Sequence, residues 1–340
     1  MYSPSLAQVL VLMIGFICSY SNFAAASDQH EFVQHEIRSL PNGAAPANSH
    51  EQHHFGYDPD EPDELGPERW SEDYRQCTGK YQSPIDIEET LVSRVSLPEL
   101  KFHGFEQEPI STMITNNGHT VLLNPKFADE PYITGGPLGF KYVFSQLHFH
   151  WGVNDSVGSE DLINNKSYPM ELHMVFFNKD YDTSDQAQGY KDGLVVLAAF
   201  VEVSEKASYQ FQSIVSALPN VTMPNQHVTV AHVPGNLNDM LPKKRNLYFT
   251  YKGSLTTPPC SEVVTWIDFK NPILLSHTQL NEFRQLHKNG NKFLTHNARP
   301  IQPLSGRPIW YNAEENYSAS NALTPAFLGL LVLSFVPLLI

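Results

Sequence analysis

Short apolar runs, broken at close intervals by Gly, Pro and Asn, limit the possible folds of this sequence more than any other feature. Between about residues 80 and 310 the breaks include NNG at 116–118 and GGP at 135–137, and helical periodicity is scarce. Such punctuation is typical of β-strands joined by turns, and it lacks the regular strand and helix alternation of a doubly wound fold. The sequence therefore predicts a single domain of mainly β (α+β) class. Its basis is a large, mostly antiparallel twisted β-sheet with short peripheral helices.

Local composition predicts where the elements lie. Strands are expected at residues 120–123, 142–151, 171–178, 194–203, 247–252 and 262–269, where β-branched and aromatic residues gather between turn signals. Short helices are expected at residues 208–217 and 278–286. With 41% hydrophobic residues, the 340-residue chain has enough apolar surface for a sizeable core.

The charge balance restricts the class of partner. The chain carries 22 Lys plus Arg against 36 Asp plus Glu, a formal net charge of -14. A protein that neutralises phosphates needs a basic face, so this balance argues against nucleic acid and leaves small neutral or cationic partners open. Residues 27–76 hold 12 acids and 3 bases, so much of the acidity lies near the N-terminus.

The N-terminal residues are expected to be a targeting segment. Residues 1–26 contain no Asp, Glu, Lys or Arg, and an apolar stretch at 6–18 is followed by three alanines at 24–26. This pattern predicts a signal peptide at 1–26, with an uncleaved anchor as the alternative. Residues 27–50 are acidic and rich in His, and they show neither helical nor strand periodicity. This composition predicts a flexible leader, with surface metal scavenging as the alternative. The folded domain is expected at 51–311.

The C-terminal residues end in an apolar tail. Residues 326–340 carry no charge and, at ~1.5 Å per residue, reach about 22 Å, short of the ~30 Å hydrocarbon core. Small residues and a short polar spacer before this tail predict replacement by a glycosylphosphatidylinositol (GPI) anchor. We expect a linker with the attachment site at 312–322 and a hydrophobic propeptide at 323–340. The attachment residue is expected to be Ser318, with Asn316 and Ser320 as rivals.

Cysteines and sequons agree with the secretory route. Cys18 would leave with the signal peptide, and the two remaining cysteines, Cys77 and Cys260, favour one disulfide in an oxidising compartment. N-glycosylation sequons occur at Asn154, Asn165, Asn220 and Asn316. We therefore expect a glycoprotein held at the extracellular face of the cell membrane by its lipid anchor.

A strand with two histidines suggests metal chemistry. In the segment QLHFHW, alternation places Gln146, His148 and His150 on one face and the apolar residues on the other. Two imidazoles therefore converge. By itself this is weak evidence, because a strand can bury or expose two histidines for ordinary reasons.

A second segment supplies a third histidine. Glu171 and His173 share one face of the strand expected at 171–178, so pairing of the two strands would bring three imidazoles together. A catalytic zinc site has that form: three neutral nitrogens at ~2.0–2.1 Å and a fourth position for water. Gln146 and Glu171 each precede a histidine by two residues, where they can hydrogen-bond its second ring nitrogen. If the two strands pair, this pattern is therefore compatible with a Zn²⁺ site.

Five motifs together resemble the α-class carbonic anhydrases in order and spacing. They are QSPIDI at 82–87, NNGH at 116–119, QLHFHWG at 146–152, ELHMV at 171–175 and SLTTPP at 254–259, and the resemblance covers about residues 54 to 303. These enzymes are a familiar case of a three-histidine catalytic zinc. The resemblance, to the secreted, membrane-anchored type, implies the α-carbonic anhydrase fold. It also implies a zinc lyase, carbonate dehydratase, that interconverts carbon dioxide and bicarbonate.

The resemblance implies a role for each catalytic residue. His148, His150 and His173 match the zinc ligands, and Thr256 matches the hydroxyl that donates to Glu160 and orients the attacking hydroxide. Without the resemblance, the last two would be read as a turn hydroxyl and a surface acid.

Substrate binding and proton transfer are expected to use further residues. Carbon dioxide has no net charge or dipole, so an apolar wall is expected, and a histidine suits proton transfer because its ordinary pKa is ~6.5. The implied residues are the wall Val175, Val196, Leu255 and Trp266, the bicarbonate contact Thr257, the shuttle His119, the water network Tyr57, Asn116 and Asn117, and the disulfide Cys77 with Cys260.

The sequence also departs from the family pattern. Phe55 stands where tryptophan is usual, Asp161 where histidine is common, and residues 176–177 and Ala298 also differ. No zinc ligand is affected. We expect a looser hydrogen-bond shell around Glu160 and altered N-terminal packing, which bear on rate more than on reaction.

Other functions stay open at the level of sequence. A catalytically silent binding or adhesion ectodomain of the same fold would be expected to lose a zinc ligand, and this chain keeps all three. An acidic matrix protein is suggested by the leader alone. A zinc peptidase is disfavoured because H-E-x-x-H is absent.

Overall fold

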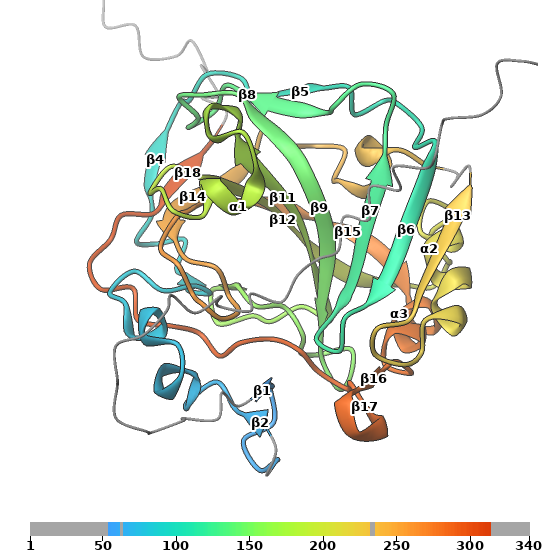
Figure 1. Cartoon of the computed structure of the whole chain (residues 1–340). Helices are drawn as coiled ribbons and strands as arrows, with labels where there is room; N and C mark the ends of the chain where they lie inside the picture. Colours follow the sequence, from blue (N-terminus) through green and yellow to red (C-terminus); the bar gives the residue numbers. More distant parts are fainter. Residues whose placement is uncertain (1–53, 62–63, 232–234, 314–340) are drawn as a thin grey trace, which may run out of the picture. The chain divides into compact units, whose positions relative to one another are not determined.

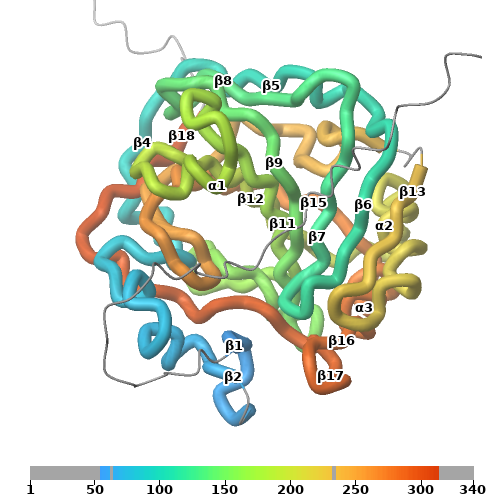
Figure 2. The backbone as a smooth tube through the Cα atoms, in the orientation of Figure 1, coloured from blue at the N-terminus to red at the C-terminus, as the bar shows by residue number. Residues whose placement is uncertain are grey.

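A large β-sheet organises the described part of the chain, drawn as a ribbon in Figure 1 and as a tube in Figure 2. The computed structural model describes residues 54–61, 64–231 and 235–313, which belong to the second of two units, Glu51–Ile340. The predicted signal peptide, leader, anchor site Ser318 and propeptide lie outside the described residues.

Twelve strands form this sheet. Their bounds are β4 Ser93–Val95, β5 Lys101–His103, β6 Ser111–Asn116, β7 Val121–Lys126, β8 Tyr132–Thr134, β9 Tyr142–Trp151, β11 Met170–Asn178, β12 Leu194–Ser204, β13 His227–Ala231, β14 Tyr248–Gly253, β15 Val264–Ser276 and β18 Trp310–Asn312. The strand order is β13-β6-β7-β9-β11-β12-β15-β14-β18-β4, while β8 pairs with β9 and β5 pairs with β8.

Neighbouring strands of the sheet are mostly antiparallel, as the sequence predicted. Within the described sheet, β12 pairs with β15 in parallel, and so does β18 with β4. A parallel pair needs a long connection, and the chain between β12 and β15 contains a helix and two further strands. The mainly β class and the single large sheet are confirmed.

Smaller elements surround the sheet. Short strand pairs are β1 His54–Phe55 with β2 Glu64–Leu65, β3 Asp86–Ile87 with β10 Leu162–Ile163, and β16 His287–Lys288 with β17 Lys292–Phe293. The described helices are α1 Ser184–Ala187, α2 Gln212–Ala217 and α3 His277–Phe283, with 3-10 turns that include η2 Arg75–Thr78 and η5 Leu237–Met240. Among the described residues, no helix combines the length and apolar character needed to cross a membrane.

The six predicted strands are present, most with shifted ends, whereas six further strands of the sheet, β4, β5, β6, β8, β13 and β18, were not predicted. β9 has the predicted bounds, whereas β15 continues to Ser276, beyond the predicted end at residue 269. Both longer helices are shorter than predicted. β6 escapes sequence-based prediction because it buries Thr112 and exposes Met113, which hides its apolar alternation.

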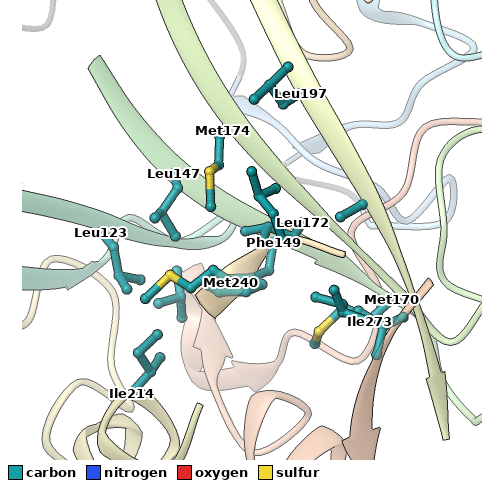
Figure 3. Packing of buried hydrophobic residues seen from close by; sticks show 14 of the residues in the cluster. Leu123, Leu147, Phe149, Met170, Leu172, Met174, Leu197, Ile214, Met240 and Ile273 are labelled. Atoms are coloured by element: carbon teal, nitrogen blue, oxygen red, sulfur yellow. The ribbon is translucent and has the colours of Figure 1, made fainter. Parts of the chain in front are cut away.

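The main core lies against one face of β9, β11 and β12 (Figure 3). Leu147, Phe149, Leu172, Met174 and Leu197 are buried there, and side chains from α2 and η5 close the cluster. Burying each such side chain contributes about 1.5–3 kcal/mol. Because side chains alternate along a strand, the histidines of β9 and β11 point to the opposite face, on strands that this core holds in place.

A disulfide joins Cys77, in η2, to Cys260. The two cysteines are 183 residues apart in the sequence. In the chain-entropy model, closing a loop of that length stabilises the folded state by about 5 kcal/mol. The predicted pairing of the two cysteines is thus present in the structure.

Candidate metal centre

The register of β9 and β11 brings three histidines together. His148 is directly opposite His173, and His150 is opposite Glu171. Directly opposite residues of antiparallel strands point to the same face. One nitrogen from each imidazole lies within 4.8 Å of the corresponding nitrogens of the other two. The predicted convergence therefore has a definite cause, the pairing of two adjacent strands.

Hydrogen bonds on the second ring nitrogen orient each imidazole. Gln146 Oε1 lies 2.9 Å from His148 Nδ1, and Glu171 Oε1 lies 2.7 Å from His173 Nε2. His150 Nδ1 donates to a backbone carbonyl oxygen at 2.8 Å. Because these acceptors hold the ring protons, the Nε2 atoms on β9 and Nδ1 on β11 are left unprotonated.

The surroundings keep the three imidazoles neutral. Burial lowers the pKa of His148 well below its usual value, and the two neighbouring imidazoles lower it further. The pKa of His173 is lowered by burial and by His150. Burial also lowers the pKa of His150, although a backbone hydrogen bond and the charge of Glu171 oppose the shift. Metal binding needs neutral imidazoles, and this group provides them near pH 7.

These residues fit a zinc ion. His150 Nε2 is buried and has no hydrogen-bond partner among the described residues, which is costly unless the atom has a ligand. Three neutral nitrogens are the donor set that catalytic zinc prefers, and they leave a fourth position for water or substrate. Oxygen-preferring ions such as Mg²⁺ and Ca²⁺ do not suit this set.

Glu171 ties the histidines to a neighbouring loop. Its Oε2 accepts hydrogen bonds from the backbone N–H groups of Glu160, at 2.9 Å, and Asp161, at 3.0 Å. Glu160 Oε1 in turn accepts from the Arg299 N–H at 2.9 Å and lies 3.3 Å from His150 Nδ1. One buried carboxylate therefore fixes both a candidate ligand and the predicted acid of the site.

Glu160 is predicted to pair with Thr256, and its surroundings allow that pairing. Burial raises the pKa of Glu160 well above its usual range, while the hydrogen bond from the Arg299 N–H and the nearby Thr256 hydroxyl lower it. Glu160 Oε2 is buried and has no hydrogen-bond partner among the described residues. Thr256 is buried, as is Tyr57, whose pKa is raised well above its usual value by burial and by the charge of Glu160. Both predicted residues therefore gather around one carboxylate.

Apolar side chains extend the same face of the sheet. Val175 lies opposite Val196, and Val196 lies opposite Trp266, across β11, β12 and β15. All three are buried, and the Trp266 ring centroid lies 4.9 Å from that of the β11 histidine. Leu255 packs against this cluster, and Thr257 is half-buried. The four predicted wall residues are thus brought together in one apolar cluster.

Two asparagines shape the turn that carries His119. Asn116 is fully buried; its Oδ1 accepts from the Gly118 N–H at 2.9 Å, and its amide group donates to two backbone carbonyl oxygens. Asn117 Oδ1 accepts from the His119 N–H at 3.0 Å. Asn116 is therefore held by the turn, and its place in a water network stays a prediction. A place for exposed Asn117 or for Tyr57 in that network stays a prediction.

The predicted shuttle is packed between aromatic rings. Phe55 stacks on His119 with centroids 3.8 Å apart and planes at 8°, and His54 meets it edge-on at 4.6 Å. Burial, His54 and Lys288 lower the pKa of His119 to about 3. In this packing the imidazole is almost never protonated at neutral pH, which does not suit a shuttle.

Sequence reasoning missed Asn297. Its carbonyl oxygen is the acceptor for His150 Nδ1, its Oδ1 accepts from the Trp151 N–H at 2.7 Å, and its amide donates to the carbonyl oxygens of Phe149 and His119. No residue-type signal marks such a position, because the contact that orients the histidine comes from the backbone. Arg299 escapes prediction for the same reason.

Asp161 corrects the expectation of a loose shell around Glu160. Its Oδ1 accepts from the Ile85 N–H at 2.6 Å, and the Tyr251 hydroxyl donates to the carboxylate at 3.0 Å. Its own N–H is held by Glu171. The acid that stands in place of the common histidine is therefore built into the network.

The predicted sequons are accessible where they are described. Asn154, Asn165 and Asn220 are exposed, whereas Asn316 lies outside the described residues. Their glycosylation stays a prediction.

Comparisons with known proteins agree with this geometry. The family model described as eukaryotic-type carbonic anhydrase matches residues 65–313. Mouse carbonic anhydrase 6 is 35% identical over 265 residues, which cover 76% of this chain and 82% of that protein. Mouse carbonic anhydrase 15 is 35% identical over 79% of this chain and 86% of its own length. Human carbonic anhydrase 7 is 38% identical over 76% of this chain and 96% of its own length.

Proposed function

The chain belongs to the eukaryotic-type carbonic anhydrase family, and we propose on that premise that it is an active zinc lyase. Its reaction is the reversible hydration of carbon dioxide to bicarbonate and a proton. One observation carries the proposal: three imidazole nitrogens, held neutral and unprotonated, converge within 4.8 Å. A silent relative of the same fold has no need to keep three oriented imidazoles, two of them fully buried.

His148, His150 and His173 would hold the zinc ion. Bound there, zinc would act as a Lewis acid that lowers the pKa of a coordinated water and so supplies a nucleophile at neutral pH. The contribution of the protein is to keep the ring nitrogens unprotonated and oriented through Gln146 and Glu171.

Thr256 and Glu160 would orient the attack. Thr256 would donate its hydroxyl proton to Glu160 Oε2, which is buried without a hydrogen-bond partner among the described residues, so that the threonine oxygen could only accept a hydrogen bond from the nucleophile. That acceptor turns an oxygen lone pair toward the substrate, which is catalysis by orientation.

The apolar cluster would bind carbon dioxide. The side chains of this cluster, Val175, Val196, Leu255 and Trp266, would offer carbon dioxide an apolar surface without hydrogen bonds. The one polar group among them, the Trp266 N–H, donates to the Ser254 carbonyl oxygen at 3.2 Å. Thr257, half-buried beside Thr256, would contact the bicarbonate product.

We also propose that the protein acts at the extracellular face of the cell membrane. The disulfide suits an oxidising compartment, and the apolar ends suit a signal peptide and a GPI anchor. Treating cells with a phosphatidylinositol-specific phospholipase should release the protein into the medium. Retention after treatment would contradict the anchor.

Stopped-flow hydration of carbon dioxide with a pH indicator, combined with metal analysis, tests the reaction. We expect about one zinc per chain and rapid hydration, and His148→Ala should lose both. Zinc-loaded wild-type protein that does not hydrate carbon dioxide would contradict the proposal and favour a binding ectodomain.

A further inference from the structure

A segment at the start of the described chain lies over His119. We call residues 54–61 and 64–65 the strap; they carry β1 and β2, and Figures 1 and 2 draw them in blue beside the orange-red β16 and β17. Asn289, between β16 and β17, contacts His54 of the strap. The strap folds back on itself, because the Gly56 N–H donates to the Leu65 carbonyl oxygen at 2.8 Å.

Lys288 fastens the strap. The side chain is 6% exposed, and its Nζ lies 2.6 Å from Asp58 Oδ2, 3.0 Å from Glu64 Oε2 and 3.8 Å from Glu61 Oε1. All three carboxylates belong to the strap. Burial alone would lower the pKa of Lys288, but the hydrogen bonds to Asp58 and Glu64 raise it above its ordinary value. A buried ammonium needs such partners, so the lysine and the strap hold each other in place.

The fastened strap determines how His119 is packed. Its Phe55 covers one face of the imidazole at 3.8 Å, and its His54 closes the edge at 4.6 Å. The turn below is fixed separately, since Asn297 holds the His119 carbonyl oxygen at 2.9 Å. β1 and β2 pair with each other outside the large sheet, but Trp70 Nε1 donates to the carbonyl oxygens of Gly56 and Leu65 at 3.0 and 2.9 Å and holds that part of the strap. His54 and Phe55 precede this anchor, so they can leave the ring without breaking the sheet.

We propose that Lys288 is a positioning residue for proton transfer: by fastening the strap it holds His119 in a packing that does not carry protons, and release of the strap frees His119 to carry them. The effect on the rate of proton transfer rests on the proposed function. The effect on the packing of His119 does not.

The two pKa values of His119, packed and free, determine how much its protonated fraction can change. With a pKa of about 3, an imidazole is protonated in about one molecule in 10⁴ at pH 7. At the ordinary value of ~6.5, about a quarter of the molecules are protonated. The titratable groups that face the strap and His119 are His54, Asp58, Glu61, Glu64, Lys288, Lys292 and His296.

Replacing the two strap acids that hydrogen-bond Lys288 separates release of the strap from simple electrostatics. Asp58→Asn with Glu64→Gln removes negative charge near His119 and keeps Lys288, so electrostatics alone would lower the pKa of His119. Release of the strap would raise it, by at least about one unit. NMR titration of the His119 ring in the full-length protein measures the shift. Glu202→Gln, at an exposed ion pair with Lys166, is the matched control and should leave His119 unchanged.

Oxygen-18 exchange between carbon dioxide and water gives the kinetic readout, because it reports interconversion and proton transfer as separate rates. In weak buffer the double variant should raise the proton-transfer rate several-fold and leave the interconversion rate unchanged. Adding His119→Ala to the double variant should remove the gain.

Three outcomes would overturn the proposal: a pKa of His119 that stays or falls, a proton-transfer rate that does not rise, or a gain that survives His119→Ala. If the double variant does not fold, Phe55→Ala removes the stack on His119, keeps the contacts of Lys288 with the strap, and should give the same rises in the pKa of His119 and in the proton-transfer rate. Wild-type protein without any exchange would refute the proposed function, while the His119 titration would still decide the role of the strap.

Discussion

Changing Glu171 to Gln should weaken zinc binding without emptying the site of ligands. The Glu171 carboxylate faces His173 Nε2 at 2.7 Å with one oxygen and accepts from two backbone N–H groups, at 2.9 and 3.0 Å, with the other. A glutamine keeps one acceptor oxygen. Its NH₂ group must then face either the ring N–H or the two backbone N–H groups, donor against donor.

The magnitude follows from which contact is lost. At least one hydrogen bond to a charged acceptor disappears in a buried site, which costs about 1.5–3 kcal/mol of the free energy of unfolding. Loss of a residue that orients a metal-bound histidine typically lowers metal affinity about 10–100-fold, or about 1.4–2.7 kcal/mol. Both losses are expected together, because the same carboxylate orients His173 and holds the loop of Glu160 and Asp161.

Competition with a chelator of known zinc affinity measures the first loss, and urea unfolding of the metal-free protein measures the second. Asp268→Asn is the matched control, since it makes the same chemical change at a buried acid whose oxygens have no hydrogen-bond partner in the described structure. It should leave zinc affinity within about twofold of wild type. If Glu171→Gln also binds zinc within twofold of wild type, the argument that Glu171 orients a ligand is wrong.

Three further variants test the fold around the site. Burial, Asp161 and Glu171 raise the pKa of Asp268 well above its usual range, so the neutral acid contributes stability that is full below the unfolded-state pKa of ~3.9 and is lost as pH rises through the folded-state pKa. Asp268→Asn should therefore lose less stability than wild type as pH rises from about 4 toward the folded-state pKa, by up to about 1.4 kcal/mol per pH unit within that window, and an equal loss would contradict this. Cys77→Ser with Cys260→Ser should cost about 2–5 kcal/mol in urea unfolding, and unchanged stability would show that the loop closure is unimportant. Leu172→Ala, in the buried face of β11, should cost about 2–5 kcal/mol, whereas Leu91→Ala, 74% exposed, should cost under about 0.5 kcal/mol.

Sequence patterns predict this molecule best where a strand alternates strictly. The segment around His148 and His150 alternates polar and apolar residues, so both its bounds and the direction of its histidines can be predicted. β6 cannot be predicted in this way, since a buried threonine and an exposed methionine mask its alternation. The resemblance to a family adds the order of the motifs, but not the contacts between them.

The contacts that sequence could not reveal depend on distant segments and on backbone groups. His150 is oriented by the carbonyl oxygen of Asn297, for which the residue type is irrelevant. His119 follows a turn motif that can be recognised, yet its protonation depends on Phe55 from the strap and on Lys288 beyond the last helix. Such properties depend on tertiary packing, which local periodicity does not encode.

The parallel pairing of β18 with β4 has a consequence for synthesis of the protein. β4, Ser93–Val95, is among the first strands made, and its partner β18, Trp310–Asn312, is the last strand described. At about 5–20 residues per second, β4 waits about 10–40 s on the ribosome before β18 exists. A chain cut short before β18 would leave the edges of β4 and β14 without a partner, and open edges recruit other chains. β18 therefore joins β4 to β14 only once the chain has been made as far as residue 312.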